Sequence, residues 1–173
     1  GSARRRASLV GITVIAGTMW NLAFAWSLHQ RECPGPIPSS ALYDGQVPGY
    51  EHYGFVNREL PPDAKLLLIG ESRAFYFHRS VEYSVVFNRN PFAEAVAAAT
   101  SDAEIIGWLR SRGITHVLVN WAEVRRLSST YGFPAVITPD LLDRLEQSDL
   151  SIARSFTLPG RSDGYVDVYA VTR

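Results

Sequence analysis

The strongest constraint in this sequence is a long charge-free segment near its N-terminus. From Ala7 to Leu28, 22 consecutive residues include no Asp, Glu, Lys or Arg, and a helix needs about 20 such residues to cross a bilayer core. Three arginines, Arg4–Arg6, precede the segment, and Trp26 lies near its end, where aromatic side chains anchor in the membrane interface. The segment predicts a transmembrane helix that leaves the rest of the chain on the extracytoplasmic side.

Two other interpretations of this segment stay open. A signal peptide or signal anchor has a similar basic start, although its apolar stretch is usually about 7–15 residues long. A helix buried in a soluble core can also be apolar all round. With the membrane interpretation, the domains are a tag scar and basic flank (1–6), a transmembrane helix (7–28), a linker (29–49) and an extracytoplasmic domain (50–173).

Composition excludes several classes of protein. The 17 basic residues equal the 17 acidic residues in number, whereas a dedicated nucleic-acid binder has a basic excess. Cys33 is the only cysteine, so an intrachain disulfide and a cysteine zinc cluster are excluded. The four histidines are not spaced as a helical metal site would require. We therefore expect no cofactor, no metal and no nucleic-acid partner.

From residue 50 onward, short apolar runs alternate with helical segments. Lys65–Gly70 is a continuous apolar run that ends in glycine, which is typical of a parallel strand buried on both faces. Ile114–Asn120 is a similar run, and it follows a helix with a capping box at Ser101 and Glu104 and a terminal glycine at Gly113. Further helices are expected at Tyr50–Leu60, at Phe92–Ala99 and after Thr138-Pro139-Asp140, and further strands at Val81–Phe87, Ser151–Leu158 and Tyr165–Thr172.

This order predicts an α/β fold. We expect a small three-layer, Rossmann-like sheet that is mostly parallel, with an antiparallel C-terminal hairpin, and a right-handed crossover between parallel strands. Lys65–Gly70 and Ile114–Asn120 should be neighbours, and open sheets bind ligands beyond the carboxyl ends of such strands. The candidate ligand-binding residues are Glu71, Ser72, Arg73, Asn120, Trp121 and Glu123.

Two of these residues have competing interpretations. Arg73 could bind a phosphate or carboxylate through two parallel hydrogen bonds, or it could form a structural ion pair with Glu71 or Glu123. Ser72 follows Gly70-Glu71, and this block resembles the Gly-Asp-Ser block of SGNH-type esterases, in which the serine is the nucleophile. That family supplies a histidine near the C-terminus, whereas the last histidine here is His116, inside a predicted strand. Ser72 or Glu71 could instead satisfy backbone donors in the turn.

Two longer stretches carry a further resemblance. Leu60–Tyr76 reads LPPDAKLLLIGESRAFY and Gly113–Trp121 reads GITHVLVNW. Both resemble the C-terminal extracytoplasmic domain of bacterial GT-C-type membrane glycosyltransferases, polytopic enzymes related to protein mannosyltransferases and aminoarabinose transferases. In organisation the resemblance covers roughly residues 55–172, and the apolar segment fits a final transmembrane helix.

The resemblance implies a parent enzyme that transfers a sugar from a polyprenyl-phosphate carrier to an extracytoplasmic acceptor. In such enzymes the catalytic carboxylate lies in an early extracytoplasmic loop, and no residue of this chain matches it. The implied role is therefore a non-catalytic domain in the bacterial envelope. Its expected partners are the membrane, the other transmembrane helices of the parent, and the polyprenyl-phosphate sugar or a glycan acceptor. The alternatives are a membrane-tethered α/β interaction module and an SGNH-like esterase that uses Ser72.

Overall fold

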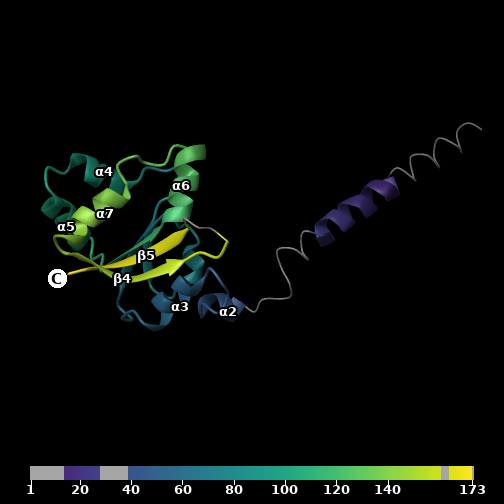
Figure 1. The fold of residues 1–173 in the computed structure, drawn as a ribbon, viewed down its shortest axis with the longest axis horizontal. Coiled ribbons are helices and arrows are strands. Elements are labelled where there is room, and N and C mark those ends of the chain that lie inside the picture. Colours follow the sequence, from purple (N-terminus) through teal and green to yellow (C-terminus); the bar gives the residue numbers. More distant parts are fainter. Residues whose placement is uncertain (1–13, 28–38, 161–163, 173) are drawn as a thin grey trace, which may run out of the picture. The chain divides into compact units, whose positions relative to one another are not determined.

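The computed structural model describes residues 14–27, 39–160 and 164–172 of the 173-residue chain. The chain divides into two units, Gly1–Pro38 and Ser39–Arg173. In the first unit, residues 14–27 form one helix. The second unit contains the sheet and the helices that surround it (Figure 1).

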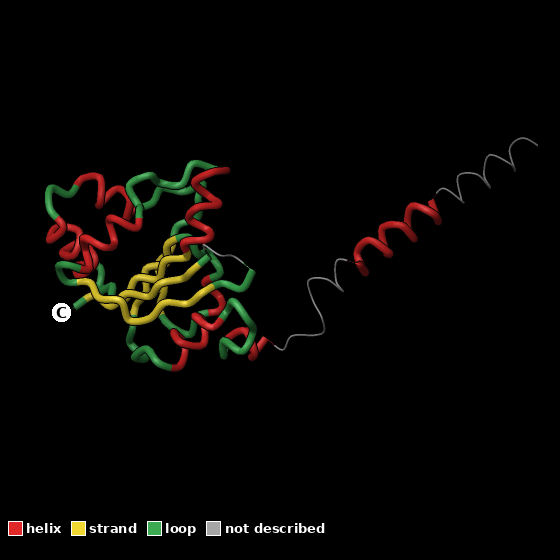
Figure 2. Tube along the Cα trace, in the orientation of Figure 1, coloured by secondary structure: helices red, strands yellow, loops and turns green. Residues whose placement is uncertain are grey.

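The second unit is built on a five-stranded mixed sheet in the order β2-β1-β3-β5-β4 (Figure 2). Its strands are β1 Lys65–Ile69, β2 Ser80–Tyr83, β3 His116–Asn120, β4 Leu150–Thr157 and β5 Tyr165–Val171. β1 pairs in parallel with both β2 and β3, and β5 pairs antiparallel with β3 and β4. The α/β class, the adjacent parallel strands β1 and β3, and the antiparallel C-terminal hairpin are therefore confirmed.

Helices lie against both faces of this sheet. They are α2 Ser39–Tyr43, α3 Glu51–Arg58, α4 Pro91–Ala98, α5 Asp102–Ser111, α6 Trp121–Thr130 and α7 Pro139–Glu146, with a 3₁₀ turn at Ala74–Tyr76. Because successive side chains of a strand point to opposite faces, β1 and β3 contribute to two separate clusters of buried residues.

The cluster on one face, which we call the α5 core, joins the sheet to α4, α5, α6 and α7. Its sheet residues include Leu67, Ile69, Val117 and Val119, and its helix residues include Ile106 and Leu142. The cluster on the other face, which we call the α3 core, joins the sheet to α3. Its members are Tyr53, Phe55, Val56, Leu60, Ala64, Leu66, Leu68, Phe77, Leu118, Val166 and Val168.

The predicted helix boundaries are confirmed by their capping contacts. The Ser101 hydroxyl accepts a hydrogen bond from the Glu104 backbone N–H at 3.4 Å, and Thr138 does the same for Leu141 at 3.2 Å. Gly113 follows α5 with a φ of +69°, as a C-terminal glycine cap requires. These caps therefore mark the starts of α5 and α7, two of the four helices that contribute to the α5 core.

The predicted strand Val81–Phe87 is wrong in its second half. β2 ends at Tyr83, which pairs with Leu68, one residue before the end of β1. Past that point β1 turns away at Gly70, so Ser84–Phe87 lack a neighbouring strand to hydrogen-bond with. The Asn88 backbone N–H instead donates to the Val85 carbonyl in a turn, at 3.0 Å.

Two further differences concern the ends of predicted segments. The helix α6 was not expected, because Asn120–Glu123 were interpreted only as residues after a strand. The predicted linker 29–49 overlaps the compact second unit, which begins at Ser39 and includes α2. The rest of that linker, residues 29–38, lies outside the described residues.

The predicted transmembrane segment is only partly described. Residues 14–27 are helical, and residues 7–13 and 28 lie outside the described part of the chain. Among the residues that the structure describes, no helix is both long enough and apolar enough to cross a membrane. In helix 14–27 the Asn21 side-chain amide donates to the Gly17 carbonyl at 2.8 Å, and Thr18 bonds the Val14 carbonyl at 2.9 Å.

Candidate functional site

A glycine turn shapes the carboxyl edge of the sheet. Gly70, directly after β1, has a φ of +68°, a conformation that glycine adopts without the penalty of a side chain. A Cβ at this position would lie 2.7 Å from the Asn120 carbonyl oxygen and 2.7 Å from the Val124 side chain. The ends of β1 and β3 therefore come close together, and Glu71, Ser72 and Arg73 follow at this edge.

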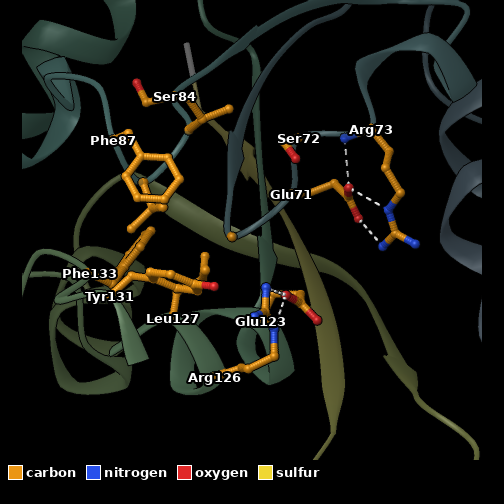
Figure 3. A pocket seen from close by; sticks show the side chains of 13 residues that line it. Glu71, Ser72, Arg73, Ser84, Phe87, Glu123, Arg126, Leu127, Tyr131 and Phe133 are labelled. Carbon is orange, nitrogen blue, oxygen red and sulfur yellow. Dashed lines mark hydrogen bonds and ion pairs between the residues drawn. The ribbon is translucent and has the colours of Figure 1, made fainter. Parts of the chain in front are cut away.

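A cavity of about 610 Å³, which we call the main cavity, opens at the same edge. Figure 3 shows Phe87, Tyr131 and Phe133 gathered on one side of it and Glu71 with Arg73 on the other. Phe87 is 81% exposed, and its ring meets the Tyr131 ring edge-on at a centroid distance of 5.6 Å. The main cavity thus has an exposed aromatic wall opposite a charged one.

The charged wall contains a tight ion pair between Glu71 and Arg73. Arg73 donates from Nη2 to Glu71 Oε2 at 2.6 Å and from Nε to Oε1 at 2.8 Å. The Glu71 side chain is 2% exposed and that of Arg73 is 38% exposed. Burial by itself raises the pKa of Glu71, but the hydrogen bonds and charge of Arg73 outweigh it and hold that pKa below its ordinary value. Glu71 is therefore ionised at neutral pH.

Aromatic rings from α3 and its start surround this ion pair. The Arg73 guanidinium lies 5.4 Å from the centroid of the Tyr50 ring and 5.9 Å from that of Tyr53, within the range of cation–π attraction. Tyr53 donates its hydroxyl to Glu71 Oε2 at 3.2 Å. Burial and the Glu71 charge both raise the pKa of Tyr53, so its hydroxyl keeps the proton that it donates.

His52 is the least satisfied polar residue near the site. Its side chain is buried, with the residue 1% exposed, and neither ring nitrogen has a hydrogen-bond partner among the described residues. Its ring lies 4.2 Å from the Tyr53 ring. Burial lowers the pKa of His52 to about 4, with Glu71 raising it and Arg73 lowering it by smaller amounts. The imidazole is therefore neutral at pH 7, with one donor and one acceptor unused.

The residues at the end of β3 and the start of α6 have separate roles. Asn120, 2% exposed, caps α6 by accepting a hydrogen bond from the Glu123 backbone N–H at 3.2 Å. Glu123 forms an ion pair with Arg126 across 2.7 Å. Trp121 points into the core instead, because its indole N–H donates to the buried Asp167 carboxylate at 2.9 Å. This contact assigns Trp121 to the packing of α6 on β5.

A second cavity of about 220 Å³ adjoins the main one. Arg73 and Glu123 line both cavities. The second cavity is also lined by His52, Asn120 and Pro48. The two side chains shared by the cavities, Arg73 and Glu123, therefore lie between the main cavity and the smaller second cavity.

The structure places most of the predicted site residues together. Glu71, Ser72, Arg73 and Glu123 line the main cavity, and Asn120 lines the second cavity. Sequence patterns do not reveal the residues that distinguish this site from any other strand edge, which are His52, Tyr50, Phe87, Tyr131 and Arg126. One available signal was the spacing of Asn120 and Glu123, which matches the start of a helix and would have placed Arg126 and Tyr131 near the edge.

The residues of the main cavity offer aromatic surface and hydrogen-bonding groups to a ligand. The described residues that line the cavity beside Ser72 include no histidine to take its proton. Among the described residues, no group of three or more His, Cys, Asp or Glu side chains is placed to hold a metal ion. The main cavity instead presents two carboxylate–guanidinium ion pairs, Glu71–Arg73 and Glu123–Arg126, opposite exposed aromatic rings.

No protein-family model matches this chain, and the comparisons with curated proteins and with solved structures find no match either. Any function assigned to the domain therefore depends on the chemistry of its own residues.

Proposed function

We propose that the unit Ser39–Arg173 is a non-catalytic, carbohydrate-binding extracytoplasmic domain of a membrane glycosyltransferase. The observation that carries the proposal is the main cavity, in which exposed aromatic rings face two carboxylate–guanidinium pairs. It lies at the carboxyl ends of the parallel strands β1 and β3, the place where open α/β sheets bind ligands. The ligand we assign to it is the glycan acceptor of the parent enzyme.

The aromatic wall suits a sugar ring. A pyranose presents one face of C–H groups, which carry partial positive charge, and an aromatic ring presents a negative face that attracts them. Phe87 and Tyr131 are 81% and 56% exposed at the cavity, so water leaves both surfaces when a ring covers them. Exposed apolar side chains that form a contiguous patch mark binding surfaces, and the rings of Phe87 and Tyr131 contact each other edge-on.

The charged wall suits hydroxyl groups rather than an anion. The two cations that line the main cavity are already matched, Arg73 by Glu71 and Arg126 by Glu123. A phosphate would have to compete with a carboxylate for either guanidinium. Neighbouring hydroxyls of a sugar can instead donate to a carboxylate and accept from a guanidinium at once. This charge balance favours a neutral glycan over the phosphate of a lipid-linked donor.

The membrane part of the proposal is based on the apolar segment Ala7–Leu28. Thr18 and Asn21, which interrupt its apolar character, bond to carbonyls of their own helix, and this lowers the free-energy cost of placing them in lipid. Flotation of the chain with lipid vesicles tests this part. The chain should float with the vesicles, and a truncated chain of residues 39–173, which keeps both cores, should stay in the aqueous fraction.

Isothermal titration calorimetry tests the carbohydrate proposal. The chain is titrated with glucose, galactose, mannose and arabinose and with di- and tetrasaccharides built from them. Phe87→Ala and Tyr131→Ala should each weaken binding about 3- to 10-fold, the scale of one aromatic contact. Phe75→Ala is the matched control, because Phe75 is 66% exposed but lies outside the main cavity. Saccharide binding that is absent, or that responds equally to all three changes, would reject the proposal.

The two alternative functions have their own tests. A tethered interaction module would share this fold, so the upstream reading frame separates it from the transferase domain: about ten apolar spans favour the transferase, and a single span favours the module. For the esterase, we expect no hydrolysis of activated acyl esters that depends on Ser72. A rate that falls in Ser72→Ala would revive the hydrolase interpretation.

A further inference from the structure

The second cavity carries an inference that is based on the proposed function and extends it. Its walls combine polar side chains, among them Asn120, with apolar residues such as Pro48 and Leu158, and they include a buried histidine, His52. The two nitrogens of that histidine have no hydrogen-bond partner among the described residues. Buried polar atoms in folded proteins are almost always satisfied. The ring borders the cavity, but both nitrogens are covered in this structure, so a hydrogen-bonding group that enters the cavity reaches them through a small rotation of the imidazole.

We propose that the second cavity is a subsite for a further sugar ring, held by His52, so that the ligand is a saccharide of two or more rings. The first ring lies in the main cavity against Phe87 and Tyr131. The chain of rings then crosses the Arg73 and Glu123 side chains, which line both cavities. The ligand is thus recognised by its length as well as by its hydroxyl groups.

The chemistry of the second cavity selects neutral hydroxyl groups. A neutral imidazole has one N–H donor and one acceptor nitrogen, which is what a hydroxyl can use in either direction. Arg73 turns one nitrogen, Nη1, toward the Tyr50 hydroxyl at 3.5 Å, while its Nε and Nη2 are held by Glu71. A volume of about 220 Å³ suits one small ring and no more.

Two substitutions test the subsite and are expected to leave the domain folded. His52→Phe keeps an aromatic ring beside Tyr53 and Phe156 but removes both nitrogens. Pro48→Trp starts from an exposed residue of the second cavity and blocks its space. Pro62→Trp is the matched control, because Pro62 is also exposed and lines neither of the two cavities. Thermal melting of each variant establishes that it is folded.

The measured quantity is the ratio of monosaccharide to disaccharide dissociation constants for the same sugar, by titration calorimetry. In the unchanged chain and in Pro62→Trp, the disaccharide should bind about 10-fold more tightly, equivalent to about 1.4 kcal/mol. His52→Phe and Pro48→Trp should bring the ratio below about 2, through weaker binding of the disaccharide. An unchanged ratio in a folded variant would overturn the subsite but not the proposed function. Failure of the unchanged chain to bind any saccharide would reject both.

Discussion

The two faces of the sheet bury different kinds of side chain. The α5 core is mainly apolar, with aliphatic residues such as Ile106 and Leu142 at its centre, both fully buried. Its one buried carboxylate in the described part of the chain, Asp167, is satisfied by hydrogen bonds from Trp121 and Tyr169. The α3 side combines apolar residues with a cluster of buried or half-buried polar groups, in which Glu71 is paired with Arg73 and His52 has no partner among the described residues. The polar cluster is also the part that borders the two cavities.

This difference separates the source of stability from the source of recognition. Apolar burial is insensitive to pH and salt and stabilises by about 25 cal/mol per Å². Buried polar groups add little net stability, and they destabilise when one partner is lost. A domain that retains such groups beside a cavity therefore has a reason other than stability to keep them, and in our account that reason is ligand binding.

The largest expected effect is on the α5 core. Ile106→Ala should lower the free energy of unfolding by about 4 kcal/mol, because it removes methyl groups from a fully buried site and leaves a cavity. The loss should be the same at pH 7 and at pH 5. Urea unfolding at both pH values checks this, and a loss that changes with pH would show that the two faces are not independent.

The next effect sharpens the comparison through pH. The pKa of His52 in the folded chain is about 4, below its ordinary value of 6.5, so between these values the unfolded chain binds the extra proton. Stability should therefore fall by roughly 3 kcal/mol as pH drops from 6.5 to 4. The unfolding free energy of the chain minus that of His52→Phe should fall by the same amount over this window, because the variant has no imidazole to protonate. A constant difference would contradict the buried, neutral state of His52.

Arg73→Ala tests the ion pair. It leaves the buried Glu71 carboxylate without its cation and should destabilise by about 2 kcal/mol, less than a fully enclosed pair because Arg73 is 38% exposed. Since the pKa of Glu71 is held low by Arg73, the stabilisation exists above pH 4.5 and is lost as pH falls through the lower folded pKa.

Melting curves of Arg73→Ala with and without Glu71→Gln check this assignment. Recovery of stability in the double variant supports a structural pair. In the intact parent, a loss of turnover per folded molecule larger than the loss of stability would instead assign Arg73 to ligand binding.

The smallest expected effect on stability is at the aromatic wall. Phe87→Ala should change the free energy of unfolding by less than about 0.5 kcal/mol, because the side chain is 81% exposed. Thermal melting checks this against the 3- to 10-fold loss of saccharide affinity expected above. A large loss of stability would show that Phe87 stabilises the fold. A loss of saccharide affinity in Phe87→Ala could then no longer be assigned to a lost contact with the sugar.

Much of the fold could be predicted because its signals are local. Apolar runs marked β1 and β3, and the capping residues Ser101 and Thr138 marked the starts of α5 and α7. The end of β2 could not be read in this way, since Val85 and Val86 favour a strand and only the turn of the neighbouring β1 at Gly70 stops it. Helix α6 could not be predicted with the same ease, because it begins directly after the apolar strand β3 with no intervening loop. Its only local signal is the spacing of Asn120 and Glu123, which is typical of a helix N-cap and its third residue.

The site was predictable only in part, because its chemistry depends on contacts distant in sequence. The carboxyl ends of β1 and β3 identified Glu71, Ser72, Arg73 and Glu123 as neighbours. His52 lies 19 residues before Glu71 in sequence, on a helix whose packing against the sheet decides whether the imidazole is buried. No local pattern reports that burial.

The most direct test of the central claim is an NMR titration of the ¹⁵N-labelled chain with the tightest-binding disaccharide of the panel. We predict that the largest shifts fall on the backbone amides of Ser72, Phe87, Glu123 and Tyr131 and on the imidazole nitrogens of His52. Amides of α7 and the middle of β4, outside both cavities, should shift little. Shifts that cluster away from the two cavities, or no shifts at millimolar saccharide, would contradict the account.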